Sequence, residues 1–286
     1  MRFVTVWSLL LSLAAAAFGE PSEVVQKKHE EMLYPVVRVT VGSGGGSGTV
    51  LYSEDRGDGC QTYVLTNHHV VDAAIKVEKT WSSLLQMDVK REVNDPIKVE
   101  VFRYSDGFRQ DVCDSYRAEI VAHDKDHDLA LVKIQTSRKL DYVAKLLPKD
   151  TTVTIFEPAW SVGCSLLHPP VAADGMVTYL DDVIDRKLYW MASAPIIFGN
   201  SGGAMFVQKN GNFFFVGVPS RVGATHSQAV EHMAYFVPAS RVRKWLADEH
   251  LTFLVDVEKT PSECFAARKD LRQKAEMTAA KAPKSD

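Results

Sequence analysis

Short segments rich in Val, Ile, Tyr and Phe recur along the chain, separated by stretches of Gly, Asp, Asn and Pro. The first group of segments covers residues 34–42, 48–54, 62–67, 97–104, 116–124 and 129–134. The second group covers residues 152–157, 175–182, 187–194, 204–208, 212–220 and 232–238. Many short strands at this spacing, without long helical periodicity between them, are typical of an all-β sandwich or barrel. The two groups therefore predict two barrels.

Helical periodicity is found mainly at the edges of this region. Residues 22–32 form a short amphipathic stretch before the first strand. The pattern of residues 238–250 predicts a terminal helix that packs Val242, Trp245 and Leu246 inward. By contrast, residues 76–95 form a polar insertion between early strands, and the charged residues after Thr260 favour a solvated helix that frays.

The first nineteen residues are typical of an export signal. A short positive start precedes an apolar run, and small residues follow at Ala17 and Gly19. The run is too short for a membrane span and is followed at once by polar residues. We therefore expect cleavage near Glu20 and a mature protein that is periplasmic or secreted. No other segment is long and apolar enough to cross a bilayer.

Charge and cysteine content exclude several kinds of partner. Lys and Arg total 33 against 36 acidic residues, so the net charge of −3 gives no electrostatic case for nucleic acid. The four cysteines are spaced too widely for paired zinc ligands, and we expect no metal and no cofactor. Export permits disulfides, and four cysteines allow three connectivities. A Cys60–Cys113 bridge is preferred because both cysteines lie near strands of the N-terminal half.

One serine lies in an unusual setting, the glycine-rich stretch FGNSGGAMF at residues 198–206. A serine hydroxyl is a poor nucleophile unless a positioned base removes its proton and a third group orients that base. Two other segments offer such groups. YVLTNHHVVDAA (63–74) ends an apolar strand in two histidines, and AHDKDHDLALVKI (122–134) places an aspartate directly before a buried strand.

These three segments resemble the catalytic motifs of the trypsin/chymotrypsin-fold serine proteases, and most of all the HtrA (Deg) branch. The likeness lies in the forms T-N-x-H-V-V, D-[LI]-A-L and G-N-S-G-G, and extends over about residues 34–247. The resemblance implies that His69 is the general base, Asp128 the orienting acid and Ser201 the nucleophile. The order His, Asp, Ser is that of the two-barrel proteases.

The same resemblance implies an all-β fold of two six-stranded antiparallel β-barrels with a C-terminal helix. The expected divisions are a signal peptide (1–19), an N-terminal segment (20–33), a protease domain (34–250, with barrels at about 34–140 and 150–250) and a charged tail (251–286). HtrA-type proteases usually carry PDZ modules after the protease domain, and about forty residues are too few for one. Trimers are common among these relatives, but the N-terminal segment carries no signature of one.

Each catalytic assignment has a competitor in the sequence. His68 is adjacent to His69, but the family pattern places the catalytic histidine immediately before Val-Val. Asp124 and Asp126 lie near Asp128, and we expect both to solvate the turn. Only Asp128 directly precedes the apolar strand that can bury its carboxylate against the imidazole.

The glycines around Ser201 suggest an oxyanion hole. Backbone N–H groups of Gly199 and Ser201 would stabilise the charge that carbonyl attack creates. Glycine at position 199 can adopt the backbone angles that point its N–H into the site. The resemblance also places the specificity pocket, where Pro195 replaces the acid that selects Lys or Arg, so we expect a small to medium apolar residue before the scissile bond. The expected lining is Pro195, Phe198, Val218, Pro219 and Ser220.

Two other functions compete with a protease that acts on proteins or peptides. G-N-S-G-G also fits the nucleophile elbow of α/β-hydrolases, which would make the protein an exported esterase. That fold requires the order Ser, acid, His, and only His226, His232 and His250 follow Ser201. The second competitor is a catalytically silent binding protein with the trypsin fold. A missing triad residue would indicate it, and none is missing.

Overall fold

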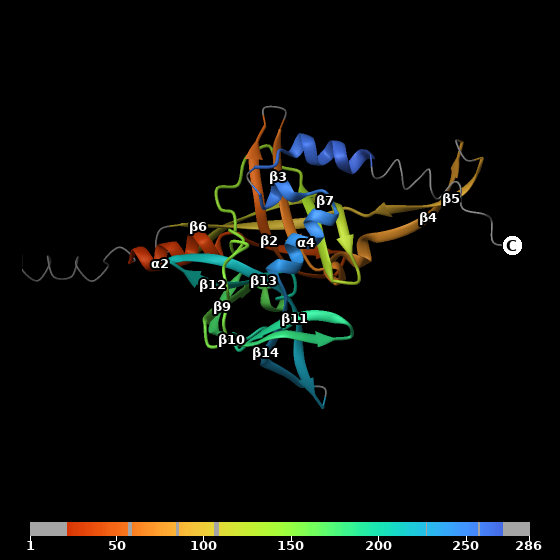
Figure 1. Ribbon diagram of the computed structural model, residues 1–286. Helices are drawn as coiled ribbons and strands as arrows, with labels where there is room; N and C mark the ends of the chain where they lie inside the picture. Colours follow the sequence, from red (N-terminus) through yellow and green to blue (C-terminus); the bar gives the residue numbers. More distant parts are fainter. Residues whose placement is uncertain are drawn as a thin grey trace, which may run out of the picture.

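The computed structural model describes residues 22–270, apart from 57–58, 84–85, 106–108, 227 and 257. Six strands close the first barrel in the order β1-β2-β3-β8-β7-β6 (Figure 1). Their bounds are β1 (Val36–Val41), β2 (Gly44–Asp55), β3 (Cys60–Thr66), β6 (Ile97–Ser105), β7 (Arg109–Asp124) and β8 (Leu129–Ile134). Each strand of this barrel overlaps one of the segments predicted from the first group.

A second barrel closes in the order β10-β11-β14-β13-β12-β9. Its strands are β9 (Pro158–Gly163), β10 (Val171–Ile184), β11 (Lys187–Ala192), β12 (Ala204–Lys209), β13 (Asn212–Thr225) and β14 (Gln228–Pro238). Neighbouring strands are antiparallel in both barrels. The prediction of two six-stranded antiparallel barrels is therefore confirmed.

One predicted strand, residues 152–157, is a turn in the structure. The Thr154 N–H donates to the carboxylate of Glu157 at 3.1 Å, and the Glu157 N–H donates to the Thr154 carbonyl at 3.3 Å. Phe156 has a φ of +73° and is exposed. The apolar residues that suggested a strand thus do not alternate between two faces, and the barrel strand β9 begins only at Pro158.

The polar insertion at residues 76–95 is a β-hairpin of β4 (Ile75–Ser82) and β5 (Met87–Asn94). It projects from the first barrel in Figure 1 and belongs to neither closed sheet. Its base is tied to that barrel by Glu92, whose carboxylate lies 3.0 Å from Nε2 of His123 on β7. Val77 and Trp81 are exposed, so this hairpin contributes little to the core.

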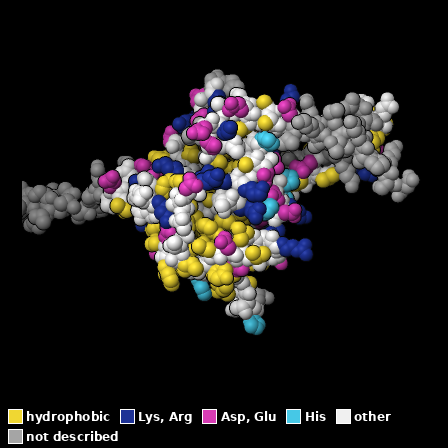
Figure 2. All heavy atoms as spheres, in the orientation of Figure 1, with side chains coloured by type: hydrophobic (Ala, Val, Ile, Leu, Met, Phe, Trp, Pro, Cys, Tyr) yellow, Lys and Arg dark blue, Asp and Glu magenta, His cyan; other side chains and the backbone are white. Residues whose placement is uncertain are grey.

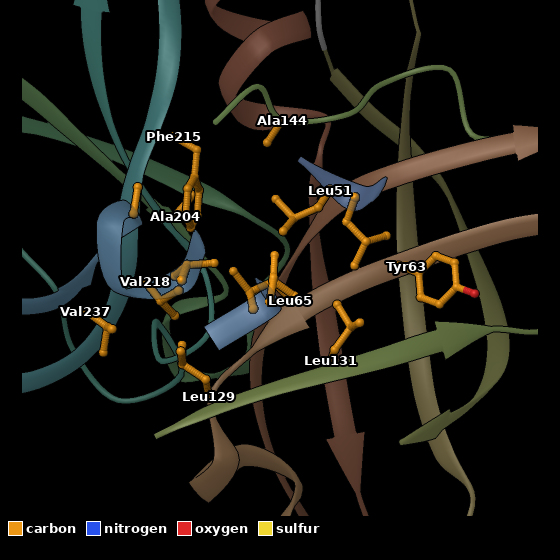
Figure 3. Close-up of a cluster of buried hydrophobic side chains, with 14 of the residues drawn as sticks. Leu51, Tyr63, Leu65, Leu129, Leu131, Ala144, Ala204, Phe215, Val218 and Val237 are labelled. Atoms are coloured by element: carbon orange, nitrogen blue, oxygen red, sulfur yellow. The ribbon is translucent and has the colours of Figure 1, made fainter. Parts of the chain in front are cut away.

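A single cluster of buried side chains joins the two barrels. It combines Leu65 and Leu129 from the first barrel with Ala204 and Val218 from the second. Figure 3 shows these side chains turned toward one another across the seam. Each barrel also has an apolar interior of its own. Because well-packed side chains resist displacement, the shared cluster fixes how the loops of one barrel face those of the other.

Helices lie at the edges, as the sequence predicts. The N-terminal stretch forms α2 (Glu23–Lys28), followed by a π-helical turn η1 (His29–Leu33). The terminal helix is α4 (Ala239–Asp248), and it buries the three residues predicted to face inward, Val242, Trp245 and Leu246. Short helical segments are α3 (His68–Val71), η2 (Asp72–Ala74), η3 (Ser165–Leu167) and η4 (Thr252–Leu254).

The first part of the charged tail packs against the first barrel, unlike the solvated helix that we expected. Residues 261–270 are helical, and Cys264 is buried. The Phe265 ring lies 5.4 Å from that of Phe253, and the Arg268 side chain donates to the Val121 carbonyl at 2.6 Å. The apolar residues of this segment therefore pack it against the first barrel, although its many charged residues hide this pattern in the sequence.

In Figure 2 the hydrophobic side chains visible on the surface gather mainly over the second barrel.

The preferred Cys60–Cys113 bridge is absent, and all four cysteines are free. Cys60 begins β3 and Cys113 lies on β7, and these strands are separated by β8 in the barrel. Nearness in sequence to a strand was therefore a poor guide to disulfide pairing.

Within the described residues, no helix combines the length and the apolar character needed to cross a membrane. The predicted signal peptide lies outside the described residues.

Candidate active site

His69 is positioned by the end of a buried strand. β3 ends at Thr66, and the short helix α3 begins two residues later with His68 and His69. Asn67, between them, is fully buried, and its side-chain amide donates to the Asp128 carbonyl at 2.7 Å. Because β3 and β8 are paired neighbours, the residues at these strand ends lie side by side.

The carboxylate of Asp128 is the centre of a hydrogen-bonded group. It lies 2.8 Å from Nδ1 of His69 and accepts a bond from the His69 backbone N–H at 3.0 Å. The hydroxyl of Ser220, on β13 of the second barrel, donates to the same carboxylate at 2.6 Å. Asp128 has a φ of +55°, and such strained positions are often found at functional sites.

Burial of Asp128 would by itself raise the pKa of its carboxyl. Hydrogen bonds from His69 and Ser220, together with the charge of His69, outweigh this effect and lower the pKa below its ordinary value. The carboxylate side chain is only 14% exposed, whereas the His69 side chain is 46% exposed. The aspartate is therefore held ionised beneath a histidine that solvent and a substrate can reach.

The competing residues have other partners. Nδ1 of His127 lies 2.6 Å from the Asp124 carboxylate, which also accepts the His127 backbone N–H at 3.0 Å, so Asp124 serves the turn. The ring of His68 packs against that of His123 at 5.2 Å. Burial first, and then the nearby His123, lower the pKa of His68. Among the three aspartates near this turn, only Asp128 contacts His69 by a hydrogen bond in the described structure.

Ser201 is half-buried in the connection between β11 and β12, three residues before β12 begins. Its carbonyl accepts a hydrogen bond from the N–H of Ser47, on β2 of the first barrel, at 2.8 Å. This contact holds the Ser201 loop against the barrel that carries His69. Among the hydrogen bonds of the described residues, none joins the Ser201 hydroxyl to His69.

The two expected oxyanion donors are unengaged. Gly199 has a φ of +94°, as its predicted conformational role requires. The preceding carbonyl, that of Phe198, is turned toward the Leu166 N–H, from which it accepts a hydrogen bond at 2.7 Å. Within the described part of the chain, the N–H groups of Gly199 and Ser201 donate to no protein acceptor.

Ser47 is a residue of the site that the sequence did not reveal. It has no exposed surface, and its hydroxyl donates to the Gly199 carbonyl at 2.6 Å while accepting the Cys164 N–H at 2.7 Å. Its own carbonyl accepts the Thr66 hydroxyl at 2.7 Å. Because the Ser47 N–H also donates to the Ser201 carbonyl, Ser47 contacts two backbone carbonyls of the turn that carries Ser201. In the sequence it lies in a glycine-rich stretch that predicts only a hairpin.

The residues expected to line the specificity pocket differ in their accessibility. Phe198 is 74% exposed and Pro195 is exposed, so both can contact a substrate. Val218 has no exposed surface and belongs to the core between the barrels. The Pro219 carbonyl accepts the Gly202 N–H at 3.0 Å. Ser220 is buried and bonded to Asp128, which gives its side chain a part in positioning that carboxylate.

A cavity of about 710 Å³ opens beside His69 and Asp128. Residues of both barrels line it, including Ser220, so it lies at the seam. Within the described residues, no group of three or more His, Cys, Asp or Glu side chains is placed to hold a metal ion. The groups that line this cavity include imidazoles, carboxylates, the Ser220 hydroxyl and basic side chains.

The sequence profile of the trypsin-like peptidase domain matches residues 46–218, more than half of the chain. The chain belongs to the trypsin-like peptidase domain family. The match includes the three motif residues and most strands of both barrels, but not β1 or β14. A search of curated proteins found no match.

Solved structures similar to this trypsin-like peptidase domain include HtrA-type proteases. Two structures of the HtrA-type protease AlgW with a tripeptide have TM-scores of 0.55 and 0.56 and sequence identities of 17% and 18%. They align with 79% and 81% of this chain, which covers 63% and 64% of theirs. A serine endoprotease from Yersinia pestis has a TM-score of 0.54 and 19% identity, with 82% of this chain and 68% of that chain aligned.

At these identities the likeness shows the fold, and this chain spans less than two thirds of the AlgW chains. The predicted resemblance to trypsin-fold, HtrA-like proteases is confirmed by the family and by these neighbours. Together they support the expected class, a serine endopeptidase of the hydrolases.

Proposed function

We propose that this protein is a serine endopeptidase that hydrolyses peptide bonds through an acyl-enzyme. Ser201 is the nucleophile, His69 the general base and Asp128 the acid that orients the base. The observation that carries the proposal is the bond of 2.8 Å between the Asp128 carboxylate and Nδ1 of His69. With the proton on Nδ1, the lone pair of Nε2 is available to accept the proton of a serine hydroxyl.

The reaction follows from these roles. Nε2 of His69 takes the hydroxyl proton as Oγ of Ser201 attacks the substrate carbonyl carbon, and the carbonyl oxygen becomes an oxyanion bound by the N–H groups of Gly199 and Ser201. The C–N bond then breaks, and His69 gives its proton to the leaving amine. Water attacks the acyl-enzyme while His69 accepts its proton, and the acid product leaves with the serine restored.

A second candidate is a silent binding protein, favoured by the lack of a hydrogen bond between the Ser201 hydroxyl and His69. Such bonds are often long in a free enzyme and tighten when substrate binds, so this observation does not outweigh the bond between His69 and Asp128. The positive φ of Gly199 also supports catalysis, as do the N–H groups of Gly199 and Ser201, which no protein acceptor occupies within the described residues.

A fluorophosphonate probe tests the proposal, since it reacts only with an activated serine. We expect labelling of the wild-type protein at Ser201, none in Ser201→Ala, and labelling slowed by at least about 10³-fold in His69→Ala. The matched control is His68→Ala, which removes the neighbouring imidazole and should label normally. No labelling of the wild type under any condition would favour the silent protein. Faster turnover of short-chain esters than of peptides would favour an esterase.

The proposal extends to the substrates and location. Exposed Pro195 and Phe198 support a small to medium apolar residue before the scissile bond.

The character of residues 1–19 supports export of the protein to the periplasm or the medium. N-terminal sequencing of the secreted protein, expected to begin near Glu20, tests this directly. Sedimentation of the purified protein tests whether it forms the trimer common among its relatives.

A further inference from the structure

Three basic side chains line the same cavity as the proposed base and acid. They are Lys125, Lys187 and Arg221, and they come from three separate segments. Lys125 lies in the turn between β7 and β8, Lys187 begins β11, and Arg221 is on β13. Lys125 belongs to the first barrel, whereas Lys187 and Arg221 belong to the second. The packing of the two barrels therefore brings these charges together.

The three charges remain available to a ligand. Nζ of Lys187 donates to the Lys125 carbonyl at 3.5 Å, and neither lysine forms an ion pair within the described residues. Arg221 stacks over the Tyr189 ring at 5.2 Å and pairs with Asp185 at 3.0 Å. The Asp185 side chain is 73% exposed, and an ion pair so open to water holds an arginine only weakly.

The acidic groups of the cavity are fewer. Asp72 and Asp128 are the carboxylates that line it. The Asp128 carboxylate accepts hydrogen bonds from His69 and Ser220 and keeps its negative charge. The three basic side chains still outnumber the two carboxylates, so the lining carries a formal charge of +1, although the whole chain has a net charge of −3. A local field opposite in sign to the net charge selects ligands by charge.

We propose that this cavity is a subsite for acidic side chains, so that preferred substrates carry Asp or Glu within about four residues of the scissile bond. An extended chain advances about 3.3 Å per residue, and the cavity begins at His69, which limits the subsite to residues close to that bond. The inference rests on the proposed function for the reaction, but it concerns binding and can be tested without turnover.

The test uses the full chain with Ser201→Ala and fluorescent peptides that differ only in having Glu, Gln or Lys at positions within four residues of one candidate bond. We expect the Glu peptides to bind about tenfold more tightly than the Lys peptides, as several weak, exposed charge contacts would give. The difference should shrink as NaCl is raised from about 50 mM to about 500 mM. In the active protein, kcat/KM should follow the same order.

Charge reversal supplies the decisive comparison. The double variant Lys125→Glu, Arg221→Glu should favour the Lys peptides, whereas Lys149→Glu, an exposed lysine outside the cavity, should leave the order unchanged. Equal affinity of the wild-type cavity for Glu and Lys peptides would overturn the inference. So would an equal change of peptide preference in the double variant and in Lys149→Glu. A charge preference in a protein that cleaves no peptide would instead overturn the proposed function and leave the subsite standing.

Discussion

Gly199 is held in a backbone conformation that a side chain could not share. Its φ is +94°, and a Cβ atom there would lie 2.3 Å from the Cys164 carbonyl oxygen. The residue is therefore glycine for two independent reasons, strain and space. Both bear on function, because the same turn aims one of the proposed oxyanion donors.

Gly199→Ala should lower kcat by roughly 10²–10³-fold, because one oxyanion donor is misdirected. The matched control is Gly211→Ala in the β12–β13 turn, where φ is +75° but a Cβ would meet nothing within 4 Å. That variant carries a similar backbone strain and should keep its kcat. Steady-state peptide hydrolysis measures both, and an unchanged kcat in Gly199→Ala would contradict the assignment.

The lowered pKa of Asp128 has a consequence for stability. The pKa of the Asp128 carboxyl is lower in the folded protein than its ordinary value of about 4 in the unfolded chain. The ionised carboxylate therefore stabilises the fold at pH values above about 4, and this stabilisation is lost as the pH falls through the lower pKa of the folded protein. At neutral pH, Asp128→Asn should be less stable by roughly 1.5–3 kcal/mol, the range for hydrogen bonds to a charged group. Urea unfolding from pH 7 to pH 2 should show this difference closing below about pH 4. A difference independent of pH would disprove it.

At the level of secondary structure elements, β2 links the two barrels at the site. Ser47, near its start, bonds to the backbone of Gly199 and Ser201, while Ser53, near its end, bonds to Leu140 and Thr62 within its own barrel. Both serines are buried on one strand. They form a natural pair for separating catalysis from stability.

We expect Ser47→Ala to lower kcat by roughly 10²-fold with KM little changed, because the oxyanion turn is free to shift by a fraction of an ångström. Ser53→Ala should lower the free energy of unfolding by about 1–3 kcal/mol, as Ser47→Ala should, but it should leave kcat unchanged. Hydrogen exchange of residues 196–203 gives a readout without turnover, and it should quicken only in Ser47→Ala. Equal kinetic effects of the two variants would reduce Ser47 to a structural role.

On the scale of the whole molecule, the site depends on how two barrels are packed. The proposed base and acid lie on the first barrel and the proposed nucleophile on the second, with the shared cluster of Figure 3 between them. Because that cluster is common to both barrels, we expect them to unfold together.

Calorimetry should therefore show one cooperative transition. Leu65→Ala, at a fully buried position of the shared cluster, should lower the stability by about 2–5 kcal/mol without splitting that transition. Val77→Ala, on the exposed hairpin, should have almost no effect. Two separate transitions in the wild type would show that the barrels are independent.

Local patterns in the sequence were enough for most of the strands, whereas the roles of the motif residues came from the resemblance to the trypsin-fold proteases and stay a prediction. The run from Leu129 to Ile134 is apolar except for Lys133, so it predicts a buried strand that Asp128 directly precedes. The prediction of a strand at 152–157 was wrong because the apolar residues of this segment are compatible with a strand and with a turn. In the structure the Glu157 carboxylate accepts the Thr154 N–H and stabilises the turn. The tail after Thr260 misled for the opposite reason, since charged neighbours mask its buried Cys264.

The sequence by itself determined the β-barrel class and the order of His69, Asp128 and Ser201, because strand periodicity and turn chemistry are properties of neighbouring residues. Only the tertiary structure decided that Ser220 donates a hydrogen bond to Asp128, that Ser47 contacts the turn that carries Ser201, and that three basic residues meet in one cavity. Those contacts join residues on different strands or different barrels. Their partners are chosen by strand register and barrel packing, which no short stretch of sequence encodes.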